Sequence, residues 1–155
     1  MLTHDDILNF VMKNFSEVKN AGNIGDLVHF HSINKFLLMA HSYYDVNVLG
    51  HLVSNHDNLS SCDILIMYEK QLGKTLSKEP TIESHSNVLE KISGYFKKNL
   101  SRDERLSIKK MILNYRNGRQ TLGSVLLYLE SLTERFQKLY LVRQTYFLLY
   151  AQVNP

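Results

Sequence analysis

Apolar residues at helical spacing recur along nearly the whole chain, and this pattern constrains the fold more than any other feature. The first such stretch places Ile7, Val11, Phe15 and Val18 three or four positions apart, which is the period of one face of an α-helix. Similar stretches follow after short breaks, and no run of alternating apolar and polar residues predicts a strand convincingly. The pattern therefore predicts an all-α fold, a compact single-domain bundle of about seven to eight helices.

Capping and breaking residues predict where these helices begin and end. Thr3 with Asp6 is typical of an N-cap, residues 20–25 break the first helix, and Asp26 is the expected cap of the second, which runs to about residue 41. Ser101 and Glu104 form a capping box, and Asn117–Gly118 is a C-terminal stop. The remaining helices are expected to end near 55–58 and to cover about 60–76, 84–99, 121–136 and 138–151, although Tyr146–Tyr150 also fits a strand.

Length and cysteine content limit the classes of protein to consider. The 155 residues suit one domain, comprising an N-terminal helix and loop at 1–25 and a main region at 26–150. Cys62 is the only cysteine, so the chain has no internal disulfide or multi-thiolate metal site, and we expect Cys62 in the core. No cofactor or metal is indicated. The acidic start lacks signal-peptide order and no apolar run spans a bilayer, so we expect a cytoplasmic protein without a membrane segment.

Basic residues are concentrated in one part of the chain. Residues 91–119 hold nine Lys and Arg against two Asp and Glu, whereas residues 1–90 hold six against eleven. On the predicted sixth helix, four basic residues lie within about 60° of its circumference, and two lysines precede them. The basic row is therefore Lys97, Lys98, Arg102, Arg105, Lys109 and Arg116. Such a row is either a solvated face or a phosphate-binding surface. Tyr95, Phe96 and Tyr115 either add stacking surface for bases or belong to the core.

The predicted second helix is apolar over most of its circumference but has one polar arc. Within about 120° lie His31, Asn34, Lys35, His41 and Ser42. Buried polar groups need partners. The arc is therefore an internal hydrogen-bond network, an exposed edge, or a polar pocket for an anionic or nucleobase-like ligand.

His85, Ser86 and Asn87 stand at the predicted start of the fifth helix, where free backbone N–H groups favour an anion. His85 shares a stripe with Leu89 and Ile92, so we expect it to point inward, toward the polar arc. The alternative is that Ser84 or Ser86 only caps the helix. No Walker loop, dinucleotide fingerprint or His-Glu-x-x-His motif occurs. Catalytic residues are otherwise unknown, and the candidate proton-transfer groups are His31, His41 and His85.

Two sequence blocks, residues 30–42 and 85–89, are followed by the segments Gly94–Lys98, Leu100–Ser101 and Tyr115–Gly118. Through these blocks and segments, the chain resembles the YbgA-like domain of unknown function over roughly residues 26–150. Some members of that family are fused to a thiouracil desulfurase domain, and others are encoded beside DNA photolyase. The resemblance implies a link to nucleobase, tRNA or nucleic-acid metabolism. The C-terminus departs from the family after Gln144–Tyr146. The motif residues carried over are His31, Lys35, His41, Ser42, His85, Asn87, Tyr95, Lys97, Lys98, Tyr115, Arg116 and Gly118.

Three functions remain open from the sequence. The first is a binding module for tRNA, single-stranded nucleic acid or a modified nucleobase. In it the basic row binds phosphates, and a pocket is lined by the polar arc, His85 and Asn87. The second is a small enzyme acting on a nucleotide or base, with the three histidines in acid–base roles and Lys35 stabilising negative charge, which requires those histidines to converge on one cavity. The third is an interaction domain for a separate desulfurase-like protein partner. The oligomeric state stays open.

Overall fold

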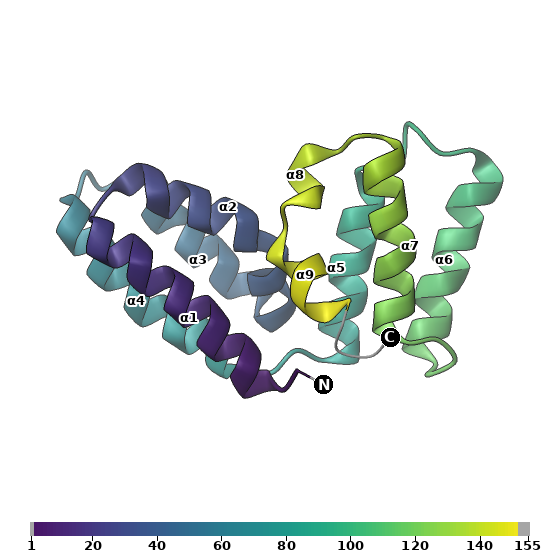
Figure 1. Ribbon diagram of the computed structural model, residues 1–155, viewed down its shortest axis with the longest axis horizontal. Helices are drawn as coiled ribbons and strands as arrows, with labels where there is room; N and C mark the ends of the chain where they lie inside the picture. The colour runs from purple at the N-terminus through teal and green to yellow at the C-terminus, as the bar shows by residue number, and fades with distance from the viewer. Residues whose placement is uncertain (1, 152–155) are drawn as a thin grey trace. The chain divides into compact units, whose positions relative to one another are not determined.

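The computed structural model describes residues 2–151, and these contain helices but no strand (Figure 1). The prediction of an all-α fold is confirmed. The single domain stays a prediction, and the described residues gather into two compact units that meet in the chain at Pro80–Thr81. We describe each unit by itself, the N-terminal unit from residue 2 to 80 and the C-terminal unit from residue 81 onward.

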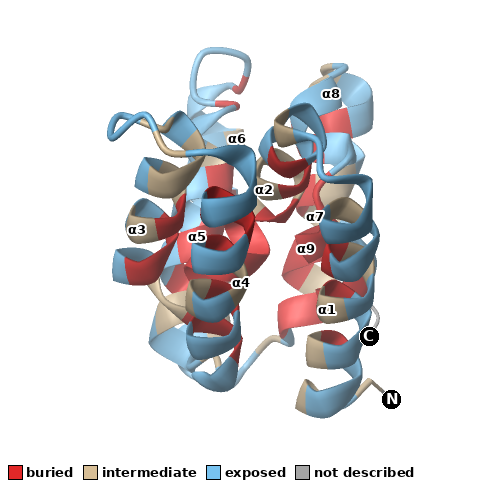
Figure 2. Cartoon of the chain, turned by 90° about the vertical axis from the view of Figure 1, so that its left-hand side faces the viewer, coloured by how far each residue is buried: buried red, intermediate tan, exposed pale blue. Residues whose placement is uncertain are grey.

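Four helices form the N-terminal unit: α1 (His4–Ala21), α2 (Ile24–His41), α3 (Tyr43–Ser54) and α4 (Ser61–Ser77). Helices α1 and α3 each pack against both α2 and α4, which makes a four-helix bundle. Figure 2 shows buried residues on the inner sides of these helices and exposed residues on the outer sides. Phe15, Phe30 and Tyr68 meet in the core, with ring centroids 5.5 to 6.1 Å apart.

The helix boundaries of this unit follow the capping residues, with one correction. Thr3 is the predicted N-cap and forms a capping box with Asp6, and α1 ends at Ala21 with Gly22 as its C-cap, whose φ of 66° suits glycine. The N-cap of α2 is Asn23 and not Asp26, because the Asn23 side chain accepts a hydrogen bond from the Gly25 N–H. Ser42 ends α2 and also caps α3, so no spare residue separates these two helices.

Five helices form the described part of the C-terminal unit: α5 (Ile82–Gly94), α6 (Arg102–Arg116), α7 (Leu122–Arg135), α8 (Leu139–Val142) and α9 (Thr145–Tyr150). Helices α5, α6 and α7 pack against one another in pairs, and α8 and α9 pack on α7. Leu89, Phe96 and Leu126 are fully buried. No helix of the described chain combines the length and apolar character needed to cross a membrane.

Two predicted helices and one predicted core residue differ from the structure. The fifth helix stops at Gly94 instead of about residue 99, and residues 95–99 form turns. The last predicted helix is two short helices, because Gln144 is extended and fully buried between them. Cys62 is exposed and not in the core. It precedes Ile64 by two positions, about 200° around α4 from the buried stripe.

Candidate functional site

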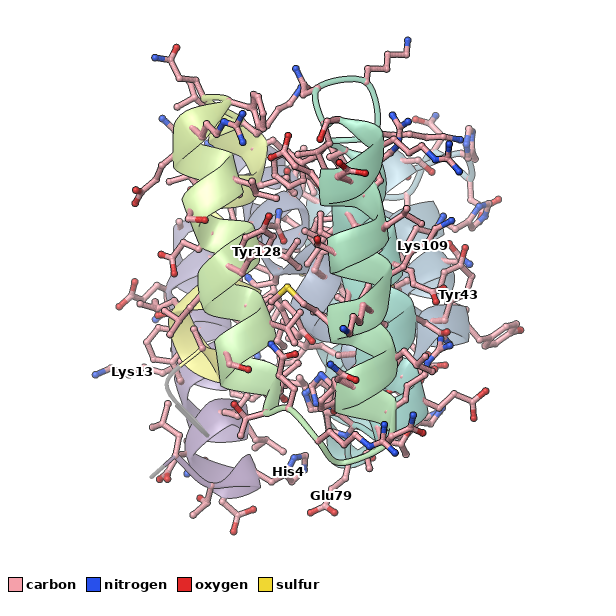
Figure 3. All side chains as sticks on the ribbon, turned by 90° about the vertical axis from the view of Figure 1, so that its right-hand side faces the viewer. His4, Lys13, Tyr43, Glu79, Lys109 and Tyr128 are labelled. Carbon is pink, nitrogen blue, oxygen red and sulfur yellow. The ribbon has the colours of Figure 1, made fainter. Side chains whose placement is uncertain are left out.

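A groove of about 720 Å³ lies along α5 and α6 in the C-terminal unit. Basic residues and apolar residues make up most of its lining. Figure 3 shows Lys109 on the side of α6 that faces away from α7. The lining residues are Glu90, Ser93, Gly94, Lys97, Leu100, Arg102, Arg105, Leu106, Ile108, Lys109, Ile112, Leu113 and Arg116.

The groove brings together five of the six residues predicted from the basic row. The five are Lys97, Arg102, Arg105, Lys109 and Arg116, whereas Lys98 is exposed but does not line the groove. Among the described residues, no carboxylate forms an ion pair with Lys97, Arg102 or Lys109. These three cations are therefore available for a ligand.

The other two lining cations already have contacts within the protein. Arg105 Nη1 donates hydrogen bonds to the carbonyl oxygens of Lys97 and Leu100, at 3.1 and 3.2 Å, and so holds the turn between α5 and α6. Arg116 Nη2 lies 3.0 Å from Oε1 of Glu90, the one carboxylate in the lining. This ion pair links α5 to α6 and lowers the positive charge at that part of the groove.

The start of α6 sets which side chains face the groove. Ser101 Oγ accepts from the Glu104 N–H and Glu104 Oε1 accepts from the Ser101 N–H, which is the capping box predicted from the sequence. Glu104 Oε2 also accepts from Arg135 Nη1 at 2.6 Å, which joins α6 to α7. The bond from Arg135, with those from Ser101, lowers the pKa of the Glu104 carboxyl. Helix α6 therefore has a defined starting point and a defined rotation.

Sequence reasoning missed the two exposed leucines of the lining, Leu106 and Leu113. Ile108 and Ile112 are buried, but Leu106 and Leu113 are 51% and 55% exposed and lie among the cations. Residues 102, 106, 109, 113 and 116 follow one another at intervals of four and three, so they share one stripe of the helix. That spacing is a signal by which both leucines can be found from the sequence.

In the polar arc of α2, the two histidines have separate partners. His31 Nδ1 lies 2.9 Å from the Tyr68 hydroxyl, and His41 Nδ1 donates to the Lys78 carbonyl at 2.7 Å. Burial lowers the pKa of each imidazole to about 4, and the charge of Lys35 contributes at His31. Ten residues of α-helix separate them by about 15 Å along the axis. His31 and His41 therefore do not meet in one cavity.

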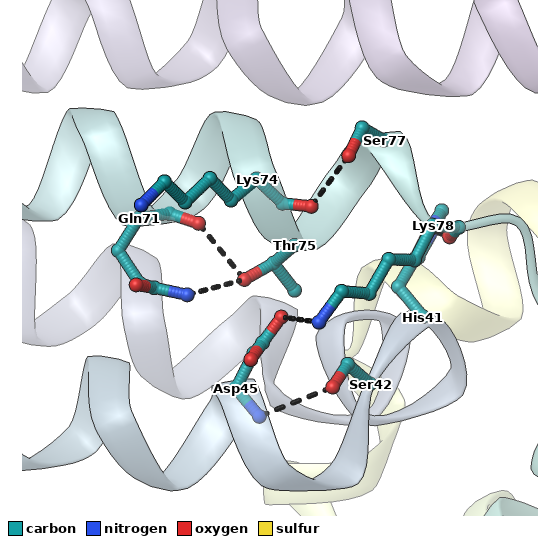
Figure 4. A network of polar contacts seen from close by, with 8 residues as sticks. All are labelled: His41, Ser42, Asp45, Gln71, Lys74, Thr75, Ser77 and Lys78. Carbon is teal, nitrogen blue, oxygen red and sulfur yellow. Dashed lines mark hydrogen bonds and ion pairs between the residues drawn. The ribbon is translucent and has the colours of Figure 1, made fainter.

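The other residues of this arc also have positions within the N-terminal unit. Asn34 Nδ2 donates to the Phe30 carbonyl at 2.9 Å, and the Ser42 hydroxyl accepts from the Asp45 N–H. Lys35 is half-buried. Figure 4 shows Ser42 beside Asp45, whose buried carboxylate lies 2.7 Å from Lys78 Nζ. These contacts support the internal network that the sequence left as one alternative.

The prediction of free backbone N–H groups at residues 85–87 is wrong. Thr81 is the N-cap of α5, with Ser84 completing a capping box, so the helix begins before the predicted start. The His85 N–H already donates to the Thr81 carbonyl at 2.9 Å. Asn87 is exposed. An anion site on backbone N–H groups therefore does not form at these residues.

His85 is buried in the C-terminal unit, whereas His31 and His41 belong to the N-terminal unit. Its Nδ1 lies 2.7 Å from the Tyr146 hydroxyl, and its ring is edge-on to Tyr150 with centroids 4.9 Å apart. Burial raises the pKa of the Tyr146 phenol well above its ordinary value, so this hydroxyl keeps its proton. The bond joins α5 to α9.

The aromatic residues next to the basic row separate into core and surface. Phe96 is fully buried, which excludes it from stacking with a ligand, and Tyr115 is half-buried. Tyr95 is 41% exposed and stacks on Tyr140, with ring centroids 5.9 Å apart. Within residues 2–151, no three His, Cys, Asp or Glu side chains are placed to bind a metal ion together.

Comparisons with known proteins place the chain among proteins without an assigned function. A family model described as "Protein of unknown function (DUF1722)" matches residues 35–151. The uncharacterized protein YbgA of Escherichia coli (strain K12) is 28% identical over 146 residues, which cover 93% of this chain and 86% of that protein. No solved structure matches this chain.

Proposed function

Because the chain belongs to the DUF1722 family of proteins of unknown function, we propose its function from its own groove: it is a nucleic-acid-binding module. Membership of this family confirms the YbgA-like resemblance read from the sequence. The observation that supports the proposal is the convergence of Lys97, Arg102 and Lys109 on one groove without ion-pair partners among the described residues. Phosphate groups are the ligands that such uncompensated cations attract.

Transfer RNA and single-stranded nucleic acid are the proposed partners, and a cytoplasmic location is part of the same proposal. Each phosphate contact releases counterions from the nucleic acid, so binding of this kind weakens steeply as salt rises. The salt dependence therefore separates phosphate recognition from recognition of an uncharged ligand.

The test is a fluorescence-anisotropy titration of labelled tRNA and of a single-stranded oligonucleotide at low and moderate salt. The test variant is K97E/K109E, which reverses two unpaired cations of the groove. Its control is K98E/K110E, which makes the same charge change at the neighbouring exposed positions outside the groove lining. Arg105 and Arg116 are left unchanged because both also hold the protein together.

We expect tight binding by the wild type, a loss of about 100-fold or more in K97E/K109E, and a much smaller loss in K98E/K110E. Equal losses in the two variants contradict a groove-specific site and indicate a diffuse charge effect. Absence of binding by the folded wild type removes the proposal and leaves a small molecule or a desulfurase-like protein as the ligand.

An enzyme with histidine acid–base groups has less support from the structure. His31 and His41 lie about 15 Å apart along α2, and each holds a hydrogen-bond partner within the N-terminal unit. Their pKa of about 4 makes them weak bases at neutral pH. The structure therefore favours structural roles for both imidazoles.

A further inference from the structure

Charged and apolar side chains alternate along the stripe of α6 that faces the groove. The order is Arg102, Leu106, Lys109, Leu113, Arg116. The intervals of four and three residues keep these positions on one side of the helix over about 21 Å. Both leucines are more than half exposed, so they are not part of the core.

This alternation limits the chemistry of the ligand. A ligand that offers only negative charge satisfies the cations but leaves Leu106 and Leu113 against water. The apolar surface continues below them in Ile108 and Ile112. The best complement therefore presents anionic and apolar groups in turn along its length, because burial of apolar surface is favourable.

Nucleic acids offer that alternation only in one form. A duplex keeps its bases stacked inside and exposes phosphates and sugars, whereas a single strand can splay its bases onto a protein surface. We infer that the groove takes single-stranded nucleic acid with unstacked bases, the phosphates on Lys97, Arg102 and Lys109 and the bases against Leu106 and Leu113. This inference rests on the proposed function and names the substrate form for the same groove.

An acidic amphipathic helix offers the same alternation but fits the groove less well. Such a helix presents its charges along one face. The cations of the groove stand on two elements, because Lys97 follows α5 while Arg102 and Lys109 belong to α6. A single strand can turn its phosphates toward both elements.

The experiment compares four probes of equal length by anisotropy at one salt concentration: a mixed-sequence single strand, the same strand with abasic sites, a hairpin duplex and an acidic amphipathic peptide. The abasic strand keeps every phosphate and lacks the bases. The test variant is L106A/L113A, and the control is L127A on α7, which is exposed to a similar extent at 53%. Circular dichroism melts verify that all variants are folded.

We expect the wild type to bind the base-bearing single strand about tenfold more tightly than the abasic strand, and to bind the duplex still less. L106A/L113A loses about tenfold for the base-bearing strand and almost nothing for the abasic strand, while L127A resembles the wild type. This pattern establishes base contact separately from phosphate contact.

Two results overturn the inference and leave the proposed function intact. One is equal affinity for base-bearing and abasic strands with no effect of L106A/L113A, while K97E/K109E still abolishes binding. The other is tighter binding of the duplex than of the single strand. Tighter binding of the acidic peptide than of every nucleic acid overturns both the inference and the proposed function.

Discussion

At the scale of single residues, the imidazoles of His31 and His41 each make a hydrogen bond to a distant part of the chain. On the largely apolar helix α2, His41 is buried and His31 is half-buried. Their partners, Tyr68 and Lys78, each lie 37 positions away in the chain. Spacing along α2 contains no information about how α4 packs against it. The sequence therefore indicated that partners are needed but could not distinguish a network from a pocket.

The two imidazoles make stability depend on pH in a defined window. Burial lowers their folded-state pKa to about 4 from 6.5, so the unfolded chain binds more protons between these values. The stability contribution is complete above about pH 6.5 and is lost as the pH falls toward 4, on the order of 3 kcal/mol for each histidine. Urea unfolding at pH 7, 5.5 and 4.5 measures this loss.

The variant H31Q tests the assignment of this pH dependence to a single group. We expect H31Q to remove about half of the loss between pH 6.5 and 4, because one titrating imidazole remains. The control H29Q alters an exposed histidine of the same helix and should keep the wild-type profile. An unchanged profile in H31Q excludes His31 as a source of the dependence.

Glu90 is expected to weaken binding of anions to the groove. Its ion pair with Arg116 occupies one of the five lining cations. We expect E90Q to raise the affinity for single-stranded nucleic acid by about three- to tenfold, since the variant frees Arg116 and removes a like charge. The stability cost is small, about 1 kcal/mol or less, because both partners are exposed. Anisotropy measures the affinity, and weaker binding contradicts the expectation.

At the scale of elements, some boundaries marked by local chemistry were predicted, such as those of α6, whereas the caps at Asn23 and Thr81 were missed. Both ends of α6 were predicted, from Ser101 and Glu104 at its start and from Asn117–Gly118 at its end, where Gly118 has a φ of 71°. The break before α9 contains neither glycine nor proline. Burial of Gln144 in the folded unit fixes that break, and a residue pattern along one segment does not show it.

The capping box of α6 should contribute measurable stability. We expect S101A to lower the free energy of unfolding by about 1 kcal/mol, because the Glu104 N–H loses its acceptor. The matched control is S107A, a change of the same size at an exposed position inside the same helix. Thermal unfolding of both variants measures the difference, and equal melting temperatures show that the cap is dispensable.

At the scale of the whole molecule, charge is divided between the two units. Residues 1–80 hold six Lys and Arg against nine Asp and Glu, a net of −3, whereas residues 81–155 hold twelve against six, a net of +6. The sequence located the basic segment, and the structure showed that five of its cations surround one groove. No glycine- or proline-rich linker marks the point where the two units meet in the chain.

This division predicts that the C-terminal unit determines the salt dependence of binding. With three unpaired cations on phosphates, the slope of log affinity against log salt is about −2 for a single strand. We expect K13E/K70E, which changes two exposed lysines of the N-terminal unit, to leave that slope unchanged, and K97E/K109E to bring it near −0.7. Titrations at several salt concentrations give the slopes, and a reduced slope in K13E/K70E contradicts the assignment.

The hydrogen bond between His85 and Tyr146 has a consequence for folding during synthesis. Its two partners are 61 positions apart, so a ribosome moving at about 5–20 residues per second adds Tyr146 some 3–12 s after His85. During that interval α6 and α7 are synthesised, while the imidazole near the start of α5 lacks its phenol partner. For those seconds, the side of α5 that contains His85 is not yet covered by α9.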